Sequence, residues 1–362
     1  MNIGIIGCGA ISNAYLESCR RFDNIHVIAC ADIDVDRAVA KASEHNVPLG
    51  CSVDDLLANS NIELVVNLTI PGVHAEVDER SLLAGKHVFS EKPLAVSVAS
   101  AKRVVELAAQ KSLRVGCAPD TVLGAGIQTS RKLIDDGAIG TPIAVNAFMM
   151  CGGHESWHPS PQFYYKVGGG PMFDMGPYYL HALITLLGPV RRVTGITRIT
   201  YPERTITSEP LAGTKVTVDV PTHVVGLLEF TSGVIGNLTT SFDIKSPFTA
   251  PIIEVFGSTG TLAVPDPNGT SGPVRVGRNG NWEEAPLTHP YRDGSRGVGV
   301  ADMACAIAAD RPHRANAEIA LHALEIMQAI HESSATGKHI DLTTTCVRPL
   351  AMRMDLPDYA LD

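Results

Sequence analysis

The chain has 362 residues, with 29 Lys and Arg against 38 Asp and Glu, so its formal charge is −9. This length favours two domains, and a hydrophobic share of 45% with a charged share of 19% excludes a disordered chain. The acidic balance argues against nucleic-acid binding, because that requires a basic face to neutralise phosphates.

No apolar run reaches the roughly 18–20 residues that span a membrane, so no membrane partner is expected. The N-terminus has no basic region before an apolar stretch, and we therefore expect no secretory signal. Eight cysteines form no Cys-x-x-Cys pair, which predicts a reducing, cytoplasmic location and no metal site.

As far as residue 117, short β-branched runs alternate with helical patterns. Strands are predicted at residues 2–6, 25–31, 63–68, 87–90 and 113–117. Helices are predicted at residues 10–22, 35–45, 73–84 and 97–110. This alternation is typical of crossover units, and it predicts a parallel sheet with helices on both faces.

Beyond residue 120 one helix (128–136) precedes a strand-rich region. The predicted strands are 143–150, 192–200, 214–220, 223–230, 234–243, 252–256 and 261–264, and helices 298–309 and 317–336 follow. Short consecutive strands favour an antiparallel sheet. The sequence thus predicts an α/β Rossmann domain (residues 1–119), then an α+β domain (residues 120–362) with a large, mostly antiparallel open sheet for substrate and oligomer contacts.

A glycine-rich turn follows the first strand and opens the first helix. Gly7 and Gly9 would let the backbone turn tightly, and Gly9, Ala10 and Ile11 would approach a pyrophosphate at the helix N-terminus. Ser12 stands where this motif has Gly or Ala. The alternative is a tight turn without a ligand.

Asp32 ends the second strand, about 20 residues after the glycines, where a carboxylate would bind the adenosine ribose of a dinucleotide. With the adjacent Ile33 it is a candidate cofactor contact. A carboxylate at this place repels the extra phosphate of NADP, and Asp34 adds to that repulsion, whereas Arg37 opposes it. The sequence therefore favours NAD over NADP, and the alternative is a solvated turn.

Glu91-Lys92-Pro93 lies at the carboxyl end of strand 87–90, the edge where ligands bind in open α/β sheets. The pKa of a partly desolvated lysine moves readily, so Lys92 is a candidate for proton transfer. A structural ion pair between Lys92 and Glu91 is the alternative.

A glycine-rich segment (168–170) precedes a helical pattern that begins at Asp174. In that helix Asp174, Tyr178 and His181 would share one face and could hold and deprotonate a hydroxyl. Pro177 is then acceptable only in the first turn of the helix. The alternative is an N-capping aspartate on an amphipathic helix.

His154-Glu155-x-x-His158 matches the zinc-protease pattern, which needs both histidines on one helix face. Pro159 disfavours a helical His158. We expect a substrate loop instead, in which His154, Trp157, His158 and Tyr164 offer hydrogen bonds and an aromatic face to a sugar. A buried aromatic loop is the alternative.

Together these motifs resemble the Gfo/Idh/MocA family, named after glucose–fructose oxidoreductase and inositol dehydrogenase. The resemblance rests on the glycine turn, Asp32, Thr69-x-Pro71-x-x-His74, Glu91-Lys92-Pro93 and the Gly-Gly…Asp174-x-Gly176 block, in the family's order. It covers essentially the whole chain.

The resemblance implies that Lys92 is the catalytic lysine and that Asp174 acts beside it. It also implies that Thr69, Pro71, His74 and Glu91 line the nicotinamide side of the cofactor. Many members have His at the position of Tyr178, while some branches have Tyr, and His181 stands where many have Asp. A homodimer or homotetramer built on the second sheet is implied as well.

The predicted function is an NAD-dependent dehydrogenase of a sugar, polyol or glycoside, with Lys92 and Tyr178 handling the hydroxyl proton. One alternative is a redox-neutral glycoside hydrolase or lyase, in which oxidation precedes elimination and the hydride returns. Another is a non-catalytic nucleotide sensor.

Overall fold

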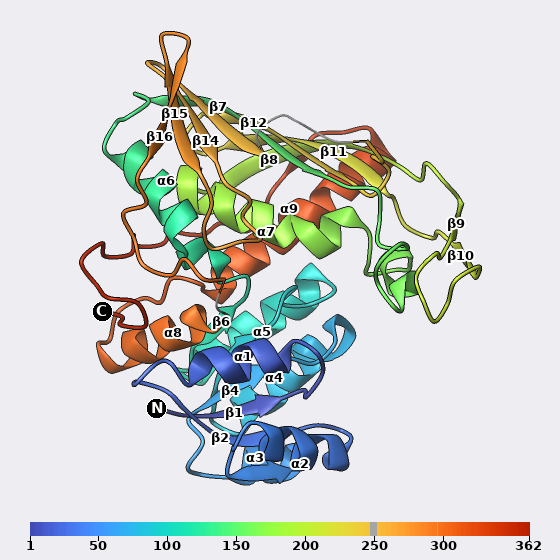
Figure 1. The fold of residues 1–362 in the computed structure, drawn as a ribbon, viewed down its shortest axis with the longest axis vertical. Helices are drawn as coiled ribbons and strands as arrows, with labels where there is room; N and C mark the ends of the chain where they lie inside the picture. The colour runs from blue at the N-terminus through green and yellow to red at the C-terminus, as the bar shows by residue number, and fades with distance from the viewer. Residues whose placement is uncertain (247–251, 295) are drawn as a thin grey trace.

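The computed structural model describes residues 1–246, 252–294 and 296–362, which form two sheets stacked along the long axis of the molecule (Figure 1). The strands of the first sheet are β1 (Asn2–Ile6), β2 (His26–Ala31), β3 (Leu49–Cys51), β4 (Leu64–Asn67), β5 (His87–Ser90) and β6 (Val115–Cys117). They are all parallel, in the order β3-β2-β1-β4-β5-β6, which confirms the Rossmann prediction.

The helices of this half are α1 (Ser12–Cys19), α2 (Val35–Glu44), α3 (Val53–Ala58), α4 (His74–Leu83) and α5 (Val98–Gln110), with a 3-10 turn η1 (Pro71–Val73). Strand β3 and helix α3 are absent from the sequence prediction, because three and six residues are too few to show a periodicity. Helix α1 is also shorter than the predicted 10–22 at both ends.

The strands of the second sheet are β7 (Pro142–Met150), β8 (Val190–Arg198), β11 (His223–Phe230), β12 (Ile235–Ser241), β13 (Ile253–Gly257), β14 (Thr261–Val264), β15 (Val274–Arg278), β16 (Asn281–Ala285) and β17 (Ile340–Asp341). Their order is β16-β15-β14-β13-β7-β12-β11-β8-β17, and among the strand pairs of the described residues only β7 and β12 are parallel. The prediction of a mostly antiparallel sheet is confirmed. Strands β9 (Glu203–Thr205) and β10 (Lys215–Thr217) form a separate antiparallel pair.

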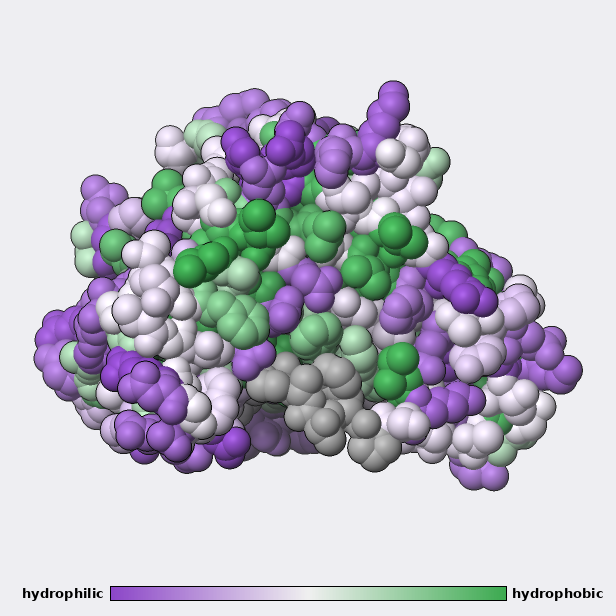
Figure 2. Space-filling model, turned by 90° about the horizontal axis from the view of Figure 1, so that it is seen from above, coloured by the Kyte–Doolittle hydropathy of each residue, from purple (hydrophilic) through white to green (hydrophobic). Residues whose placement is uncertain are grey.

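One face of the second sheet is covered by helices α6 (Ala125–Asp135), α7 (Pro171–Leu187) and α9 (Ala317–Thr336), which lie between the two sheets (Figure 1). None of the described helices covers the opposite face, and apolar side chains gather over its middle (Figure 2). Helix α8 (Val298–Ala308) and two 3-10 turns, η2 (Thr121–Leu123) and η3 (Pro161–Tyr165), complete the described elements.

Helix α7 starts earlier than predicted. It begins at Pro171 rather than at Asp174, after Gly170 with a φ of 86°. Pro177 therefore lies inside the helix and not in its first turn, and it has no N–H to donate to the carbonyl of Phe173. The buried contacts on nearly every side of α7 outweigh the cost of that missing bond.

The chain returns to the first sheet after leaving it. The Cys117 N–H donates to the Ala315 carbonyl (3.0 Å), and Gly116 pairs with Asn316 at the edge of β6. Helix α8 also packs on β6, and the Val98 N–H on α5 donates to Gln328 of α9 (3.3 Å). The two halves therefore share several contacts besides the linker near residue 119.

Within the ranges 1–246, 252–294 and 296–362, no helix is both long and apolar enough to cross a membrane.

Asp78 gives the first half a pH-dependent stability. Its side chain on α4 is fully buried and accepts a bond from Asn67 Nδ2 (2.7 Å). Burial raises the pKa of this carboxyl from 3.8 to about 7, against the opposing effect of Asn67 and Ser90. Because the unfolded chain loses this proton at a lower pH than the folded one, stability falls as pH rises from about 4 to about 7.

The effect of Asp78→Asn on the free energy of unfolding should therefore depend on pH. Relative to the natural chain, the variant should be about 2–3 kcal/mol more stable at pH 8 than it is at pH 5. Urea unfolding at both pH values measures this difference. Asp36→Asn, at an exposed position of α2, is the matched control and should show none of it. An equal effect of Asp78→Asn at both pH values would contradict the assignment.

Candidate functional site

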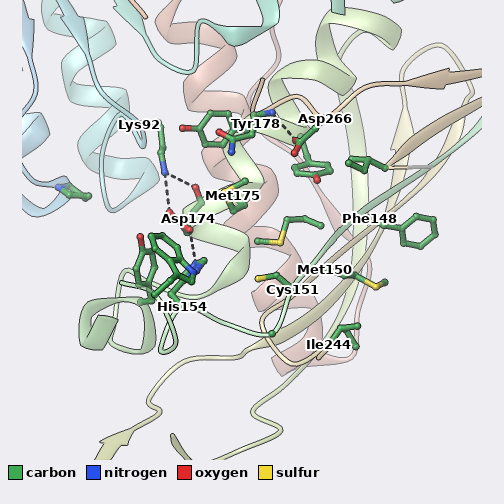
Figure 3. Close-up of a pocket in the computed structure, with 18 of the residues that line it drawn as sticks. Lys92, Phe148, Met150, Cys151, His154, Asp174, Met175, Tyr178, Ile244 and Asp266 are labelled. Atoms are coloured by element: carbon green, nitrogen blue, oxygen red, sulfur yellow. Dashed lines mark hydrogen bonds and ion pairs between the residues drawn. The ribbon is translucent and has the colours of Figure 1, made fainter. Parts of the chain in front are cut away.

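A cavity of about 990 Å³ opens between the two sheets (Figure 3). Its wall includes residues from the segments that follow strands β1, β4 and β5, so it sits at the carboxyl edge of the parallel sheet. From the predicted site residues it brings together Ile11, Thr69, Pro71, His74, Glu91, Lys92, His154, Trp157, Tyr164, Asp174 and Tyr178.

The glycine turn has the shape that its sequence predicts. Gly7 has a φ of 102°, and a Cβ there would lie 2.6 Å from the Leu68 backbone, so no other residue fits. A Cβ at Gly9 would meet no protein atom within 4 Å. The fold itself therefore does not require glycine at position 9, and the backbone there is open to a ligand.

Asp32 is built into this turn. One carboxylate oxygen accepts the Cys8 N–H (2.8 Å), and the other accepts the Asp34 N–H (3.0 Å) and lies 3.4 Å from Arg37 Nη1. Arg37 also pairs with Asp34 (3.3 Å). The neighbouring Ile33 is 97% exposed and free to meet a ligand.

His74 joins the two loops that follow β4 and β5. Its Nδ1 lies 2.7 Å from the Pro93 carbonyl oxygen, and its Nε2 lies 3.1 Å from that of Thr69. The ring is buried, and burial lowers its pKa although both carbonyl contacts oppose that change. His74 thus fixes the loop of Lys92 relative to the Thr69–Pro71 wall.

Lys92 pairs with Asp174 and not with Glu91. Its Nζ donates to the Asp174 backbone oxygen (2.7 Å) and to the Asp174 carboxylate (3.2 Å), as Figure 3 shows. The Glu91 carboxylate instead accepts from the buried Tyr15 hydroxyl (2.9 Å) and from the Lys92 N–H (2.9 Å). The alternative interpretation of the Glu-Lys-Pro motif was an ion pair between the side chains of Glu91 and Lys92. That pair does not form among the described residues.

The ionisation of this pair follows from its partners. Burial lowers the pKa of Lys92, but Asp174, Tyr178 and Glu91 outweigh it, so the pKa is raised above its ordinary value. Burial raises the pKa of Asp174, but His154 and Lys92 reverse this and leave it lowered. Lys92 is thus an ammonium and Asp174 a carboxylate at neutral pH.

Tyr178 lies beside Lys92, whose Nζ is 5.2 Å from the centre of the phenol ring. Arg296 is a second cation near the same ring, with its Cζ 5.7 Å from the centre. Burial raises the pKa of Tyr178, and both cations only partly oppose this. The phenol oxygen has no hydrogen-bond partner in the part of the chain that the structure describes.

The structure does not bring His181 to the cavity. Its side chain is fully buried in the core around α7, and burial lowers its pKa to about 3. The helix does place Asp174 and Tyr178 together, but His181, one turn further, is enclosed by protein. The predicted substrate contact at His181 is therefore corrected: the structure buries this side chain away from the cavity.

The predicted substrate loop closes the cavity from the second half. His154 Nε2 lies 3.5 Å from the Asp174 carboxylate, and its ring packs against Tyr164 (centroids 4.1 Å apart). Trp157 is 61% exposed and lies edge-on to His154. His158 does not line the cavity; it packs against Trp157 and Tyr164 from behind.

The zinc-protease pattern does not form its helix. Residues 154–158 make a turn, as Pro159 predicts, and the Glu155 carboxylate is held by Arg204 and the Tyr165 hydroxyl. Across the described ranges, no group of three or more His, Cys, Asp and Glu side chains is placed to hold a metal ion.

Several residues of the site escaped the sequence analysis. Asp266 and Asn268 line the cavity, and Tyr15 and Arg296 lie behind Glu91 and Tyr178. Asp266 and Asn268 belong to the turn sequence Asp266-Pro267-Asn268-Gly269, which indicates a turn but not a place in the cavity. Tyr15 and Arg296 have no motif around them.

Two family models match the chain. Residues 1–118 match the model described as "Oxidoreductase family, NAD-binding Rossmann fold", and residues 127–263 match the "GFO/IDH/MocA C-terminal domain". Together the two matches cover more than two thirds of the chain.

Individual relatives are more distant. An uncharacterized oxidoreductase of Schizosaccharomyces pombe is 29% identical over 46% of this chain and 46% of its own length, so the chain aligns with less than half of that relative. The inositol 2-dehydrogenase of Ralstonia nicotianae is 28% identical over 75% of this chain and 76% of its own length.

Among solved structures, levoglucosan dehydrogenase in complex with NADH and L-sorbose matches with a TM-score of 0.80. The match covers 95% of this chain and 99% of that one at 20% identity, which shows the fold alone. The family models, read with the two sheets and the Lys92–Asp174 pair, lead to one conclusion: the chain belongs to the GFO/IDH/MocA family of oxidoreductases.

Proposed function

We propose that this chain is an NAD-dependent dehydrogenase that moves a hydride between nicotinamide and a secondary carbinol carbon of a sugar, polyol or glycoside. The observation that carries the proposal is the Lys92–Asp174 pair beside an unpartnered Tyr178 hydroxyl. These groups lie in a cavity that Thr69, Pro71 and His74 close on the other side. The relatives' names support the substrate class, since one is an inositol dehydrogenase and another a levoglucosan dehydrogenase.

The residues present fit a dinucleotide. The open backbone at Gly9, followed by Ala10, Ile11 and the N-terminus of α1, suits a pyrophosphate. The carboxylate of Asp32 suits a ribose diol, and the exposed Ile33 side chain offers an apolar contact next to it. When bound, the cofactor supplies the acceptor or donor of the hydride.

The chain itself supplies orientation and proton transfer. The Lys92 ammonium and the Tyr178 hydroxyl both face the site and can hydrogen-bond the reacting oxygen, while Asp174 holds Lys92 in place. Either group donates a proton when a ketone is reduced. Either must first lose its own proton before it can accept one from an alcohol.

The rate of alcohol oxidation should therefore rise with pH. Because the pKa values of Lys92 and Tyr178 are both raised, kcat/KM for oxidation should increase between pH 7 and pH 10, by up to about tenfold per unit. Ketone reduction should be level over this range and decline above it. Initial rates in both directions measure the two profiles, and an oxidation rate that falls from pH 7 to pH 10 would contradict the assignment.

The function itself is tested with a panel of aldoses, inositols and methyl glycosides, assayed at 340 nm with NAD. We expect at least one compound to produce NADH in proportion to its consumption. Consumption without accumulating NADH would indicate the redox-neutral cycle instead. An unchanged panel after long incubation would leave the nucleotide sensor as the better reading.

We further propose that two copies of the chain associate through the bare face of the second sheet. Ile196, Leu227 and Ile235 are large exposed apolar side chains on adjacent strands of that face, and Figure 2 shows apolar side chains gathered near its middle. Leu227→Lys should shift the protein toward a monomer in sedimentation, whereas Val39→Lys on α2 should not. A monomeric natural chain would disprove this proposal.

The division into a cofactor domain (1–119) and a substrate and oligomer domain (120–362) is part of the same proposal. All eight cysteines are free thiols, which supports a reducing compartment such as the cytoplasm.

A further inference from the structure

A second cavity, of about 630 Å³, adjoins the first one. The two share Gly152 and Lys245 in their walls, so they meet at the end of the substrate loop. The second cavity lies toward the β9–β10 pair, which stands at the edge of the molecule (Figure 1). None of the proposed hydride or proton steps uses it.

The wall of this cavity is held rigidly by Arg204 on β9. Arg204 is only 3% exposed on its side chain and bonds Glu155 (2.6 Å), the Gly152 carbonyl (3.2 Å) and the Asp243 carboxylate. One residue thus ties β9 to the substrate loop and to the end of β12. Two further bonds, from the Thr207 and Ser208 N–H groups to the Glu155 carbonyl (2.8 and 3.0 Å), fix the same contact.

These bonds hold β9 against the loop, because separating them would leave the buried Arg204 charge without partners. The Nε of Arg204 is itself buried and has no partner in the described ranges. The guanidinium therefore acts in the wall as a structural support, and the groups open to the cavity are other side chains.

The accessible lining is polar with one aromatic side chain. Tyr201 is 41% exposed, and Arg204 and Lys245 each lie 5.4 Å from the centre of its ring. Ser156, Thr205 and Thr207 add hydroxyls on exposed positions. The Lys245 ammonium stands at the junction of the cavities and has no ion-pair partner among the described residues.

We infer that this second cavity is a subsite for a second sugar ring, so that the substrate is a disaccharide or a larger glycoside. One ring lies by Lys92 and Tyr178, and the next lies against Tyr201 beyond Gly152 and Lys245. Hydroxyl donors around an exposed aromatic side chain are the chemistry that recognises a pyranose ring. This inference rests on the proposed function, which supplies the first ring.

The test compares monosaccharides with disaccharides. Glucose, maltose, cellobiose, lactose and trehalose are titrated calorimetrically into the protein with NADH present, and their KM values are measured with NAD. We expect one disaccharide at least to bind about tenfold more tightly than glucose, the gain of roughly one net hydrogen bond. Equal affinity of glucose and all four disaccharides would overturn the inference.

Two variants of Tyr201 test whether the extra affinity for a disaccharide arises in the second cavity. Tyr201→Ala should remove the advantage of the disaccharide and leave the affinity for glucose unchanged, and Tyr201→Phe should retain part of it. Trp282→Ala, an exposed aromatic residue on β16, is the matched control and should change neither. Loss of glucose and disaccharide binding in equal proportion in Tyr201→Ala would contradict the subsite.

The calorimetric arm separates this inference from the proposed function. Tighter binding of a disaccharide without any NADH formation would support the subsite and contradict the dehydrogenase. Turnover of monosaccharides without any preference for a disaccharide, in binding or in KM, would support the dehydrogenase and contradict the subsite.

Discussion

Replacing Lys92 with alanine should lower kcat by about 10²–10⁴-fold, the usual contribution of a placed proton-transfer group. The ammonium that bonds Asp174 and lies 5.2 Å from the centre of the Tyr178 ring is removed, while the glycine turn and Asp32 are untouched. The measurement is NADH formation with the best substrate of the panel, together with fluorescence titration of NADH. Normal turnover in Lys92→Ala would refute the role of Lys92.

Matched variants separate charge from proton transfer. Lys92→Arg keeps a cation beside Asp174 but cannot give up its proton, so it should be nearly as slow as Lys92→Ala. Lys111→Ala, at the exposed C-terminus of α5, should turn over normally. Tyr178→Phe removes only the hydroxyl; a larger loss in Tyr178→Phe than in Lys92→Ala would make Tyr178 the group that moves the proton.

Replacing Asp32 with alanine should lower kcat/KM for NAD by about 10- to 100-fold, because bonds to a charged carboxylate contribute about 1.5–3 kcal/mol. The same change should improve NADP, since it removes the repelling charge and frees Arg37 from one of its two carboxylate partners. Kinetics with both cofactors at a fixed sugar concentration measure the ratio.

Arg37→Ala in the Asp32→Ala background is the control for this change. It should abolish the gain with NADP but leave the loss with NAD in place, because only the phosphate needs the guanidinium. If Asp32→Ala reduced the use of both cofactors equally, the role of Asp32 would be limited to holding the Cys8 N–H of the turn.

The first half of the fold was predictable because its signals are local. Each strand–helix unit shows its own periodicity, and the glycine turn and Glu91-Lys92-Pro93 follow strands directly.

The β15–β16 hairpin of the second sheet was not predicted, although it too has a local signal. Asn279-Gly280, with both residues at positive φ, joins Arg278 to its partner Asn281.

The rest of the site depends on contacts between distant segments. Lys92 and Asp174 are 82 residues apart, and only the resemblance to a family joined them. Arg204 meets Glu155 and Asp243 from a short strand without any motif. His181 shares the helical spacing of Asp174 and Tyr178, but spacing does not say how far a cavity extends along a helix.

The return of the chain to β6 bears on how the crevice could admit its ligands. With Cys117 bonded to Ala315, α8 packed on β6, and α5 bonded to α9, the first sheet is joined to the second half at its β6 edge and through α5. Swinging the two sheets apart would break all of these contacts together, whereas the Trp157 side chain, which is 61% exposed at the rim, can turn without breaking the bonds that hold Glu155 in its loop. We therefore expect the proposed substrate to enter and leave through local rearrangement at the rim, and not through a hinge at residue 119.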